Sequence, residues 1–425
     1  MCGAEMNAEA DIDWEKLYAG RAAGMRASEI RELLKVLDQP DVISFAGGIP
    51  DPALFPTEQI RDAYARILSD PVLGPQALQY SVSEGYPPLR RWIVAHMASL
   101  GVACEADNIV ITSGSQQGLD FLGKLLLSPG DTALVTRPTY LGALQAFNPY
   151  EPRYDTLRPA ERINDPQAYV QAARAAGGRV ALAYAVPDFA NPTGETLSES
   201  ERRNLLHLAA ALDIPLIEDV AYRALRYEGD PVRPMLALDI ERCGDIDRSR
   251  VIYCGTFSKT IAPGLRVGWI CAARELVHKV VLAKQAGDLH TSTLNQMVMA
   301  DVAERLYDRQ VPALIQAYRT RRDAMLTALE RHMPAGVRWT HPEGGMFVWV
   351  TLPEGLDGAE LLAAALEEER VAFVPGSAFF ADRGGRNTFR LNFTLQSPQE
   401  IGDGLSRLGA LLRRRLRAGP EPARA

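Results

Sequence analysis

The chain has 425 residues, of which 47% are hydrophobic and 23% are charged, and its formal net charge is −7. A single hydrophobic core stops growing near roughly 250–300 residues, so this length predicts more than one lobe. The acidic balance gives no basic field that would attract nucleic acid or anionic lipid, and no apolar run approaches the ~20 residues that span a bilayer. We therefore expect a small-molecule partner, and neither nucleic acid nor a membrane.

The cysteines indicate a reducing compartment. Their number is odd and their spacing shows no pairs: Cys2, Cys104, Cys243, Cys254 and Cys271. Such a set is no disulfide framework, and residues 1–15 lack the apolar segment of a signal peptide. We expect a cytoplasmic protein and assign no metal site.

The first predicted element is an amphipathic helix. Apolar residues recur at helical spacing within residues 26–37, and Ser28 stands at the N-cap position. A short strand at 42–45 then leads into Gly47 and Gly48, where paired glycines let the backbone approach a ligand closely. A plain turn is the alternative.

A candidate anion site follows two further helices, which are expected within residues 58–100. A strand at 109–111 enters a small-residue turn at 113–118 and then a helix at 119–127. Free N–H groups and the positive dipole at such a helix start favour phosphate. Ordinary capping by Ser115 is the alternative.

From residue 132 the chain alternates between strands and helices, which implies a mostly parallel sheet covered on both faces. The expected strands are 132–136, 180–186, 215–218 and 251–254, with helices after Tyr140 and at 198–212. Several polar residues fall at or just after the carboxyl ends of these strands, the edge where open α/β sheets bind ligands. They are Tyr140, Asn191, Asp219, Tyr222 and Lys259.

The last part of the chain predicts a second lobe. A helix at 296–332 gives way to short strands at 337–339, 344–350, 371–375 and 389–393, and then to a helix at 398–416. We predict an α/β protein with a mostly parallel central sheet covered by helices in a large domain at 61–325. A smaller α+β domain is built from both termini, from an N-terminal arm and strand at 1–60 and from residues 326–425.

The segment around Lys259 combines three kinds of group. Hydroxyls at Thr256, Ser258 and Thr260 surround one amine, and Arg266 follows seven residues later. A nucleophile, anion donors and a fixed cation together suit an amine that holds a phosphorylated aldehyde. A surface turn with an ordinary lysine is the alternative, because short motifs match by accident.

Taken together, these segments resemble the fold-type I pyridoxal-phosphate aminotransferases of class I/II, and most closely the branch of 2-aminoadipate aminotransferase and kynurenine aminotransferase II. The matching segments are residues 30–35, 44–48, 78–81, 113–117, 191–194, 219–223 and 257–259. The resemblance implies a ping-pong transfer of an amino group, with pyridoxal 5′-phosphate as cofactor. The donor is an L-amino acid (2-aminoadipate, glutamate, or a broad set with leucine and aromatics), and the acceptor is a 2-oxo acid such as 2-oxoglutarate.

The resemblance also implies roles for single residues. Lys259 matches the lysine that forms the Schiff base and carries the proton, and Asp219 matches the partner of the pyridine nitrogen. Tyr222 and Asn191 match donors to the phenolic oxygen, and Tyr140 matches the aromatic that stacks on the ring. The further cofactor-binding positions are Ser258 and the phosphate-binding set Ser115, Gln116, Thr256 and Arg266, together with Tyr80, which matches a residue that reaches the neighbouring subunit. A homodimer with shared active sites is therefore implied.

For the substrate, Arg390 matches the arginine that binds the α-carboxylate through its planar bidentate group, assisted by Asn191 and the backbone of Gly48. Arg31, with Ser28 one turn earlier, matches a residue that meets a distal carboxylate, although a helix arginine is usually solvated. Two positions depart from the family pattern: Ala190 replaces a common glutamine, and Thr256 replaces a more usual serine.

Two alternatives stay open. The same cofactor could serve another carbanion chemistry, such as that of a β-lyase, because the fold does not fix the reaction. A regulator with an aminotransferase-like effector domain would require an N-terminal helix-turn-helix, and only about two dozen residues precede the first matched helix.

Overall fold

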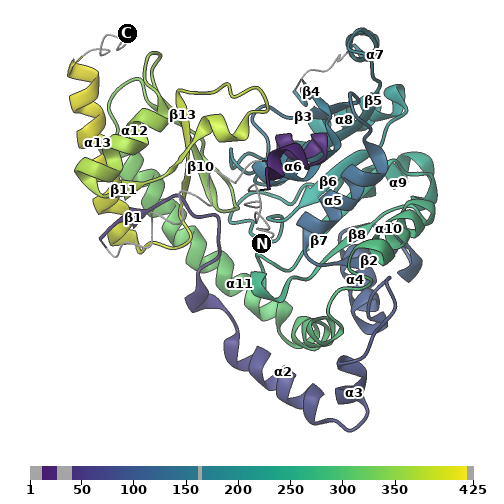
Figure 1. The fold of residues 1–425 in the computed structure, drawn as a ribbon. Coiled ribbons are helices and arrows are strands. Elements are labelled where there is room, and N and C mark those ends of the chain that lie inside the picture. The colour runs from purple at the N-terminus through teal and green to yellow at the C-terminus, as the bar shows by residue number, and fades with distance from the viewer. Residues whose placement is uncertain (1–11, 26–40, 161–164, 419–425) are drawn as a thin grey trace, which may run out of the picture.

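The computed structural model describes residues 12–25, 41–160 and 165–418. Figure 1 shows a large lobe around a twisted sheet and a smaller lobe that contains β10 and β13, with the long helix α11 running between them. The helix predicted at 26–37 lies outside the described residues. The predicted domain limits at residues 60 and 325 stay a prediction.

The large lobe is built on a sheet of seven strands in the order β2-β8-β7-β6-β5-β3-β4. The strands are β2 Ile109–Thr112, β3 Thr132–Val135, β4 Arg153–Thr156, β5 Val180–Ala185, β6 Leu216–Val220, β7 Val251–Thr256 and β8 Gly268–Cys271. β3 to β7 pair in parallel, whereas β8 is antiparallel to both β7 and β2. The prediction of a mostly parallel sheet is confirmed.

Two apolar layers hold this sheet. Alternate residues of one strand face opposite layers, as Ile252 and Cys254 do in one and Val251 and Tyr253 in the other. One layer packs under α5 Ser115–Leu126, α6 Leu141–Phe147 and α10 Arg274–Gly287. The other packs under α4 Pro87–Ser99, α7 Pro166–Ala175, α8 Glu199–Leu212, α9 Met235–Cys243 and the first part of α11 Thr293–His332.

Several predicted limits shift in the structure. α5 begins at Ser115, four residues before the expected start, because Gly114 turns the chain with φ of 84° and the helix follows at once. β6 extends to Val220, beyond the predicted end at residue 218, because its pairing with β7 continues to Gly255. α11 begins at Thr293 and runs for 40 residues through Pro312.

The smaller lobe joins segments from both parts of the chain. Its four-stranded antiparallel sheet has the order β12-β13-β10-β9, with β9 Arg338–Trp339, β10 Phe347–Thr351, β12 Val374–Pro375 and β13 Thr388–Asn392. β1 Ile43–Ser44 pairs in parallel with β11 Val371–Ala372, so an N-terminal strand lies beside a C-terminal one. The single strand predicted at 371–375 is thus two short strands. α12 Gly358–Ala364 and α13 Pro398–Ala418 cover this lobe (Figure 1).

At the lower end of Figure 1, α2 Thr57–Ser69 and α3 Leu73–Ala77 project from the body of the molecule. α2 packs on α11, and the described chain contains no helix that is long and apolar enough to span a bilayer. Within the same described ranges, no group of three or more His, Cys, Asp or Glu side chains is arranged to hold a metal ion. Cys104, Cys243, Cys254 and Cys271 are free thiols.

Candidate active site

Lys259 lies three residues beyond the end of β7, at the carboxyl edge of the large sheet. Its Nζ donates to the carbonyl oxygen of Gly48 at 3.1 Å, so it reaches the segment that follows β1. Desolvation, helped by the positive charges of Arg390 and Arg266, lowers the pKa of the Lys259 side chain to about 8. An appreciable fraction of this amine is therefore neutral, and nucleophilic, near neutral pH.

Asp219 lies within β6 and is 4% exposed. Its Oδ2 accepts a hydrogen bond from the Tyr184 hydroxyl at 2.7 Å, whereas its buried Oδ1 has no partner among the described residues. Burial raises the pKa of Asp219 to about 6, although the bond from Tyr184 opposes the shift. The carboxyl therefore has a free acceptor in a site that penalises its charge.

Arg390, on β13, brings the smaller lobe into the site. One guanidinium nitrogen donates to Asn191 Oδ1 at 2.8 Å, and the other donates to the carbonyls of Ala46 and Gly47 at 3.1 and 3.2 Å. The amide of Asn191 in turn donates to the hydroxyl of Tyr222 at 3.4 Å. Asn191 therefore links the two lobes through one side chain.

The surroundings of Arg390 are apolar. Its guanidinium lies 4.3 Å from the ring centre of Phe347 and 5.0 Å from that of Phe379, and the residue is 1% exposed. Burial lowers the pKa of Arg390 to about 10, so the group stays cationic at neutral pH. A Cβ on Gly48 would lie 3.6 Å from this guanidinium, so Gly48 borders it closely.

A second cationic corner forms at the start of α5. Arg266 donates to the carbonyl of Ser113 at 3.3 Å, and a Cβ at Gly114 would lie 2.2 Å from the same guanidinium nitrogen. The hydroxyl of Thr256 bonds that of Ser258 at 2.9 Å, and Thr256 pairs with Gly268, where a Cβ would lie 2.7 Å from the backbone nitrogen of Ser115. The free N–H groups of α5, its Ser115 and the Arg266 cation thus face one corner.

Gln116 and Tyr140 adjoin this corner. The Gln116 amide donates to the carbonyl of Gly142 at 2.7 Å, which joins α5 to the start of α6. Tyr140 precedes α6, and a Cβ at Gly142 would lie 2.4 Å from its ring. Glycine at 142 therefore lets the aromatic ring lie against the helix start.

Among the described residues, one predicted site residue, Tyr80, is not part of this group. Tyr80 is 80% exposed and meets the ring of His290 edge-on, with 6.0 Å between centroids. Ser28 and Arg31 lie outside the described residues. All other predicted positions converge at the carboxyl edge of the sheet.

Comparison with known proteins identifies the family. The family model described as aminotransferase class I and II matches residues 40–408. The chain belongs to this family. It is a pyridoxal-phosphate-dependent transaminase of fold type I.

Relatives with different names resemble this transaminase over nearly the whole chain. The aromatic-amino-acid aminotransferase 1 of Thermococcus litoralis is 44% identical, with 96% of each chain covered. The kynurenine aminotransferase structure from Pyrococcus horikoshii, in complex with PMP, has a TM-score of 0.86 at 42% identity, covering 95% of this chain and 98% of that one. The α-aminoadipate aminotransferase structure from Thermus thermophilus, complexed with N-(5′-phosphopyridoxyl)-L-leucine, has a TM-score of 0.85 at 39% identity, covering 96% and 100%.

Sequence reasoning missed two groups that support the transaminase site. Tyr184 carries the one side-chain hydroxyl of the otherwise apolar strand β5 and donates it to Asp219. A lone hydroxyl in a buried strand was the available signal that a polar partner lies nearby. Behind the cationic corner, Lys284 is fully buried and bonds Asp288 at 2.9 Å, and Asp288 accepts from Ser113 at 3.0 Å and from Gln117 at 2.7 Å. A lysine and an aspartate four residues apart on a helix predict only an ordinary surface pair, so this signal was weak.

Proposed function

We propose that Lys259 anchors pyridoxal 5′-phosphate at the carboxyl edge of the large sheet and that Arg390 binds the α-carboxylate of the amino acid. The observation that carries this proposal is the convergence of three groups of unlike chemistry: an amine with a lowered pKa, a buried carboxyl with a raised pKa, and a buried guanidinium. Such opposed shifts in one site are typical of catalytic groups.

Asp219 fits the ring nitrogen of the cofactor. Its Oδ1 is buried and unpaired within the described part of the chain, and a protonated pyridine nitrogen would give it a charged donor. Tyr184 holds the other oxygen and thereby fixes the direction of the free one. When bound, the cofactor supplies an aldehyde for Lys259 and a ring that accepts electrons from the substrate.

The cationic corner fits the cofactor phosphate. Ser115 and the first N–H groups of α5, with Arg266, Thr256 and Ser258, provide the hydroxyl, amide and guanidinium donors that phosphate prefers. Gln116 joins this corner to Gly142 beside Tyr140, so ring stacking by Tyr140 and phosphate binding are held together.

Asn191 and Tyr222 are assigned to the phenolic oxygen of the cofactor. Each can donate a hydrogen bond, and they already lie 3.4 Å apart in a buried position. Donors at this oxygen stabilise its anionic form, which lowers the basicity of the lysine-bound cofactor.

The residues of the chain then have separate tasks in the transfer. Arg390, fixed by Asn191 and by two backbone carbonyls, orients the substrate carboxylate next to Gly48. The amine of Lys259 would serve as the base that takes the proton from the substrate Cα and as the acid that delivers it to C4′ of the cofactor. The rings of Phe347 and Phe379 exclude water from the carboxylate site.

The substrate proposal is broad. The names of the similar proteins support an L-amino acid donor from the set 2-aminoadipate, leucine, aromatic amino acids and kynurenine. We add glutamate as a donor and a 2-oxo acid such as 2-oxoglutarate as the acceptor, as the resemblance described above implies. Arg31, with Ser28, stays the proposed binding partner of a distal carboxylate on the substrate side chain. The Arg31→Ala change should reduce activity on acidic donors selectively, and equal loss on all donors would contradict this role.

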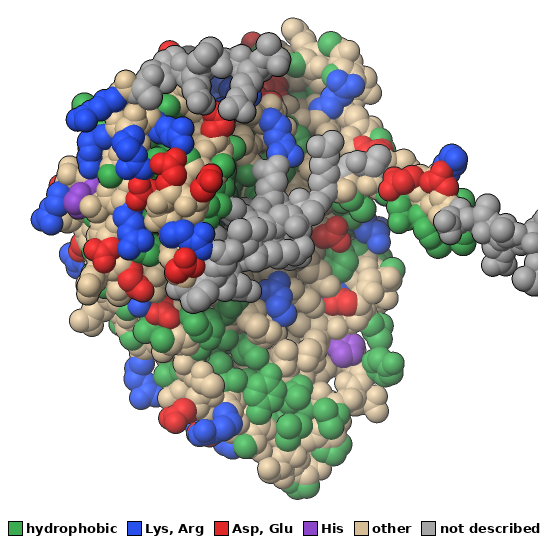
Figure 2. Space-filling view, turned by 60° about the vertical axis from the view of Figure 1, so that its left-hand side comes forward, with side chains coloured by type: hydrophobic (Ala, Val, Ile, Leu, Met, Phe, Trp, Pro, Cys, Tyr) green, Lys and Arg blue, Asp and Glu red, His purple; other side chains and the backbone are tan. Residues whose placement is uncertain are grey.

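We further propose a homodimer with shared active sites. Exposed apolar side chains lie on and just after α2 and α3, and Figure 2 shows hydrophobic side chains gathered at the lower end of one face. They are Leu68, Val72, Leu78, Tyr80 and Val82. Tyr80 lies within this set, which supports its proposed contact with the cofactor of the partner subunit.

The four free thiols of the described residues support the proposal of a reducing, cytoplasmic setting.

One half-reaction tests the proposed function. The purified protein, loaded with pyridoxal phosphate and mixed with an amino acid alone, should yield one pyridoxamine phosphate and one 2-oxo acid for each site. Release of ammonia with unchanged cofactor would indicate a β-lyase instead.

Arg390→Lys should raise the KM for amino acids by about 100-fold, because a point charge replaces a bidentate donor.

A further inference from the structure

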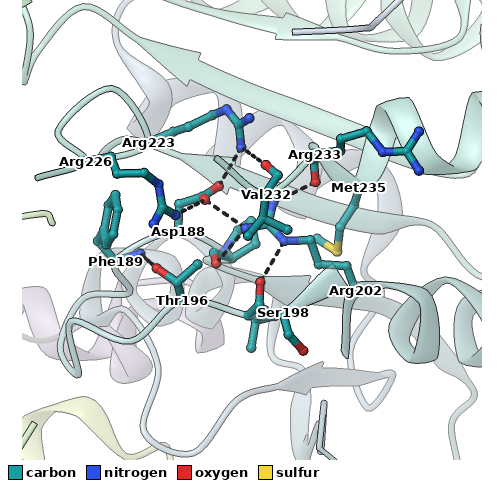
Figure 3. A network of polar contacts seen from close by, with 12 residues as sticks. Asp188, Phe189, Thr196, Ser198, Arg202, Arg223, Arg226, Val232, Arg233 and Met235 are labelled. Carbon is teal, nitrogen blue, oxygen red and sulfur yellow. Dashed lines mark hydrogen bonds and ion pairs between the residues drawn. The ribbon is translucent and has the colours of Figure 1, made fainter. Parts of the chain in front are cut away.

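Asp188 is the centre of a buried charge cluster that none of the site residues belongs to (Figure 3). Its side chain is 1% exposed and meets three arginines: Arg202 at 2.8 Å, Arg223 at 3.3 Å and Arg226 at 3.7 Å. Arg202 is fully buried. Arg202 thus pairs with Asp188 out of reach of water, whereas the side chains of Arg223 and Arg226 are 14% and 11% exposed and Arg226 also pairs with Glu343 at 2.9 Å. All three guanidinium groups share the one buried carboxylate, which ties their positions to it.

Arg202 closes the loop that carries Asn191. Its guanidinium donates to the carbonyls of Pro187 and Leu197 at 3.1 and 3.0 Å, which are the two ends of this loop. Across the same ends, the Leu197 N–H donates to the Pro187 carbonyl at 2.9 Å. Asn191 is thus presented at the tip of a loop whose ends are fixed by one buried cation.

The other two arginines belong to the turn that carries Tyr222. Arg223 directly follows Tyr222 and donates to Asp188, and Arg226 stacks on the ring of Phe189 at 4.7 Å (Figure 3). Phe189 has φ of 51°, a left-handed conformation that a non-glycine residue adopts only where its surroundings enforce it. The cluster therefore joins the Asn191 loop and the Tyr222 turn through one carboxylate.

We propose that Asp188 is a positioning residue that sets the spacing between the Asn191 amide and the Tyr222 hydroxyl. This spacing determines how well the two groups donate hydrogen bonds to the cofactor's phenolic oxygen. The proposal rests on the assignment of these two donors in the proposed function. It assigns Asp188, Arg202 and Arg223 to the tuning of the bound cofactor, although none of them reaches it.

The test is the pH midpoint of the visible absorbance of the cofactor-loaded, substrate-free protein. Asp188→Asn keeps the shape of the side chain and removes its charge, so the arginines lose their common anchor. Looser donors stabilise the anionic phenolic oxygen less, and the midpoint should rise by about half a pH unit to one pH unit. The side chain of Arg223 is 14% exposed, so Arg223→Gln should cost less stability than Asp188→Asn. It should shift the midpoint in the same direction.

A charge-balanced variant separates anchoring from simple charge repulsion. Asp188→Asn combined with Arg226→Gln removes one charge of each sign, so thermal stability should partly recover while the midpoint stays raised. Asp239→Asn is the matched control, because Asp239 is equally buried and pairs with Arg242 at 2.8 Å. Its other bonds reach Ser249 and Arg250 before β7, at the opposite edge of the sheet.

Asp239→Asn should lower the melting temperature and leave the midpoint unchanged. An unchanged midpoint in both Asp188→Asn and Arg223→Gln would overturn the proposal, as would an equal shift in Asp239→Asn. Failure of the proposed function would look different: the wild-type protein would then show no pH-dependent visible absorbance with pyridoxal phosphate at all.

Discussion

Desolvation acts in opposite directions on two residues of the candidate site. It lowers the pKa of Lys259 to about 8 and raises that of Asp219 to about 6, because burial penalises the charged form of each. The amine thereby becomes a nucleophile near neutral pH, and the carboxyl gains from a cationic partner. These shifts give the first two predictions.

Lys259 should capture the cofactor with its own pH dependence. Only the neutral amine attacks an aldehyde, so the rate of absorbance change after mixing cofactor-free protein with pyridoxal phosphate should rise with pH through a midpoint near 8. An ordinary lysine would give a midpoint near 10.5. Lys259→Ala, the control, should show no such phase.

Asp219 should destabilise the cofactor-free protein above its folded pKa. Its pKa is raised from 3.8 to about 6, so the folded state binds more protons than the unfolded state across this window, and stability falls as pH rises through it. A shift of about two units corresponds to roughly 3 kcal/mol at pH 7. Cofactor-free Asp219→Asn should therefore lose less stability than the wild type between pH 4 and 7.

Urea unfolding of the cofactor-free proteins at both pH values measures this difference. Equal pH dependence in the two proteins would contradict the raised pKa. With cofactor bound, the order should invert, because the wild-type carboxylate then has a charged partner and Asp219→Asn does not.

At the level of elements, the loop between β2 and α5 requires glycine. Gly114 has φ of 84°, and a Cβ there would lie 2.2 Å from a guanidinium nitrogen of Arg266. Gly177 has φ of 86° with nothing within 4 Å, so it offers the same backbone strain without the clash. This pair separates a conformational effect from displacement of Arg266.

Gly114→Ala should weaken pyridoxal phosphate binding by more than about tenfold, since it displaces Arg266, the proposed phosphate donor, and should leave binding of pyridoxal without phosphate unchanged. Gly177→Ala should lose a similar ~1 kcal/mol of backbone stability and keep full cofactor affinity. Spectroscopic titration of the cofactor-free proteins measures both. Equal loss for the two ligands would show that Gly114 serves folding alone.

The predictability of these elements followed their patterns. The buried strands β5 and β7 are largely apolar, and β6 begins with the apolar pair Leu216 and Ile217 before Glu218 and Asp219. The helix at 198–212 begins with a capping box, so the sequence identifies these elements directly. β4 was missed because its residues Arg153–Thr156 are polar and only partly buried, as suits an edge strand. β8 was missed because its pairing with β7 depends on a turn at Arg266. This residue has φ of 53°, and the spacing of apolar residues does not predict such a turn.

The site residues also divide into those that the sequence identifies and those that only the fold reveals. Lys259, Asp219 and Asn191 stand in short motifs at strand ends, so their spacing along the chain identifies them. Tyr184 and Asp188 bond partners that are 35 and 14 residues away, and Lys284 bonds Gln117, which is 167 residues away, besides its near neighbour Asp288. Such contacts exist only once the sheet brings the segments together, so the sequence alone could not reveal them.

At the scale of the whole molecule, the site depends on both lobes. Arg390 and Gly48 come from the smaller lobe and its β1 segment, whereas Lys259, Asp219 and Asn191 come from the large sheet. The exposed apolar set around α3 lies outside both cores, and a second copy of the chain would cover it in the proposed dimer. The dimer gives the fourth prediction.

Leu78→Glu should convert the proposed dimer to a monomer, because it places a charge among side chains that this dimer would bury. Leu78 is 74% exposed in the single chain, so its own fold should tolerate the change. Cofactor affinity should fall at the same time if Tyr80 reaches the partner's phosphate. Leu416→Glu, at the 37% exposed end of α13, is the control and should remain dimeric by light scattering.

The proposed role of Lys259 is tested most directly by the position at which the cofactor is covalently bound. Reduction of the loaded protein with borohydride, followed by proteolysis and mass spectrometry of the peptides, locates the modified lysine. We expect one pyridoxyl group for each chain, on Lys259, and none in Lys259→Ala. A label on Lys284, which is fully buried, or on no lysine at all, would contradict the proposed role of Lys259.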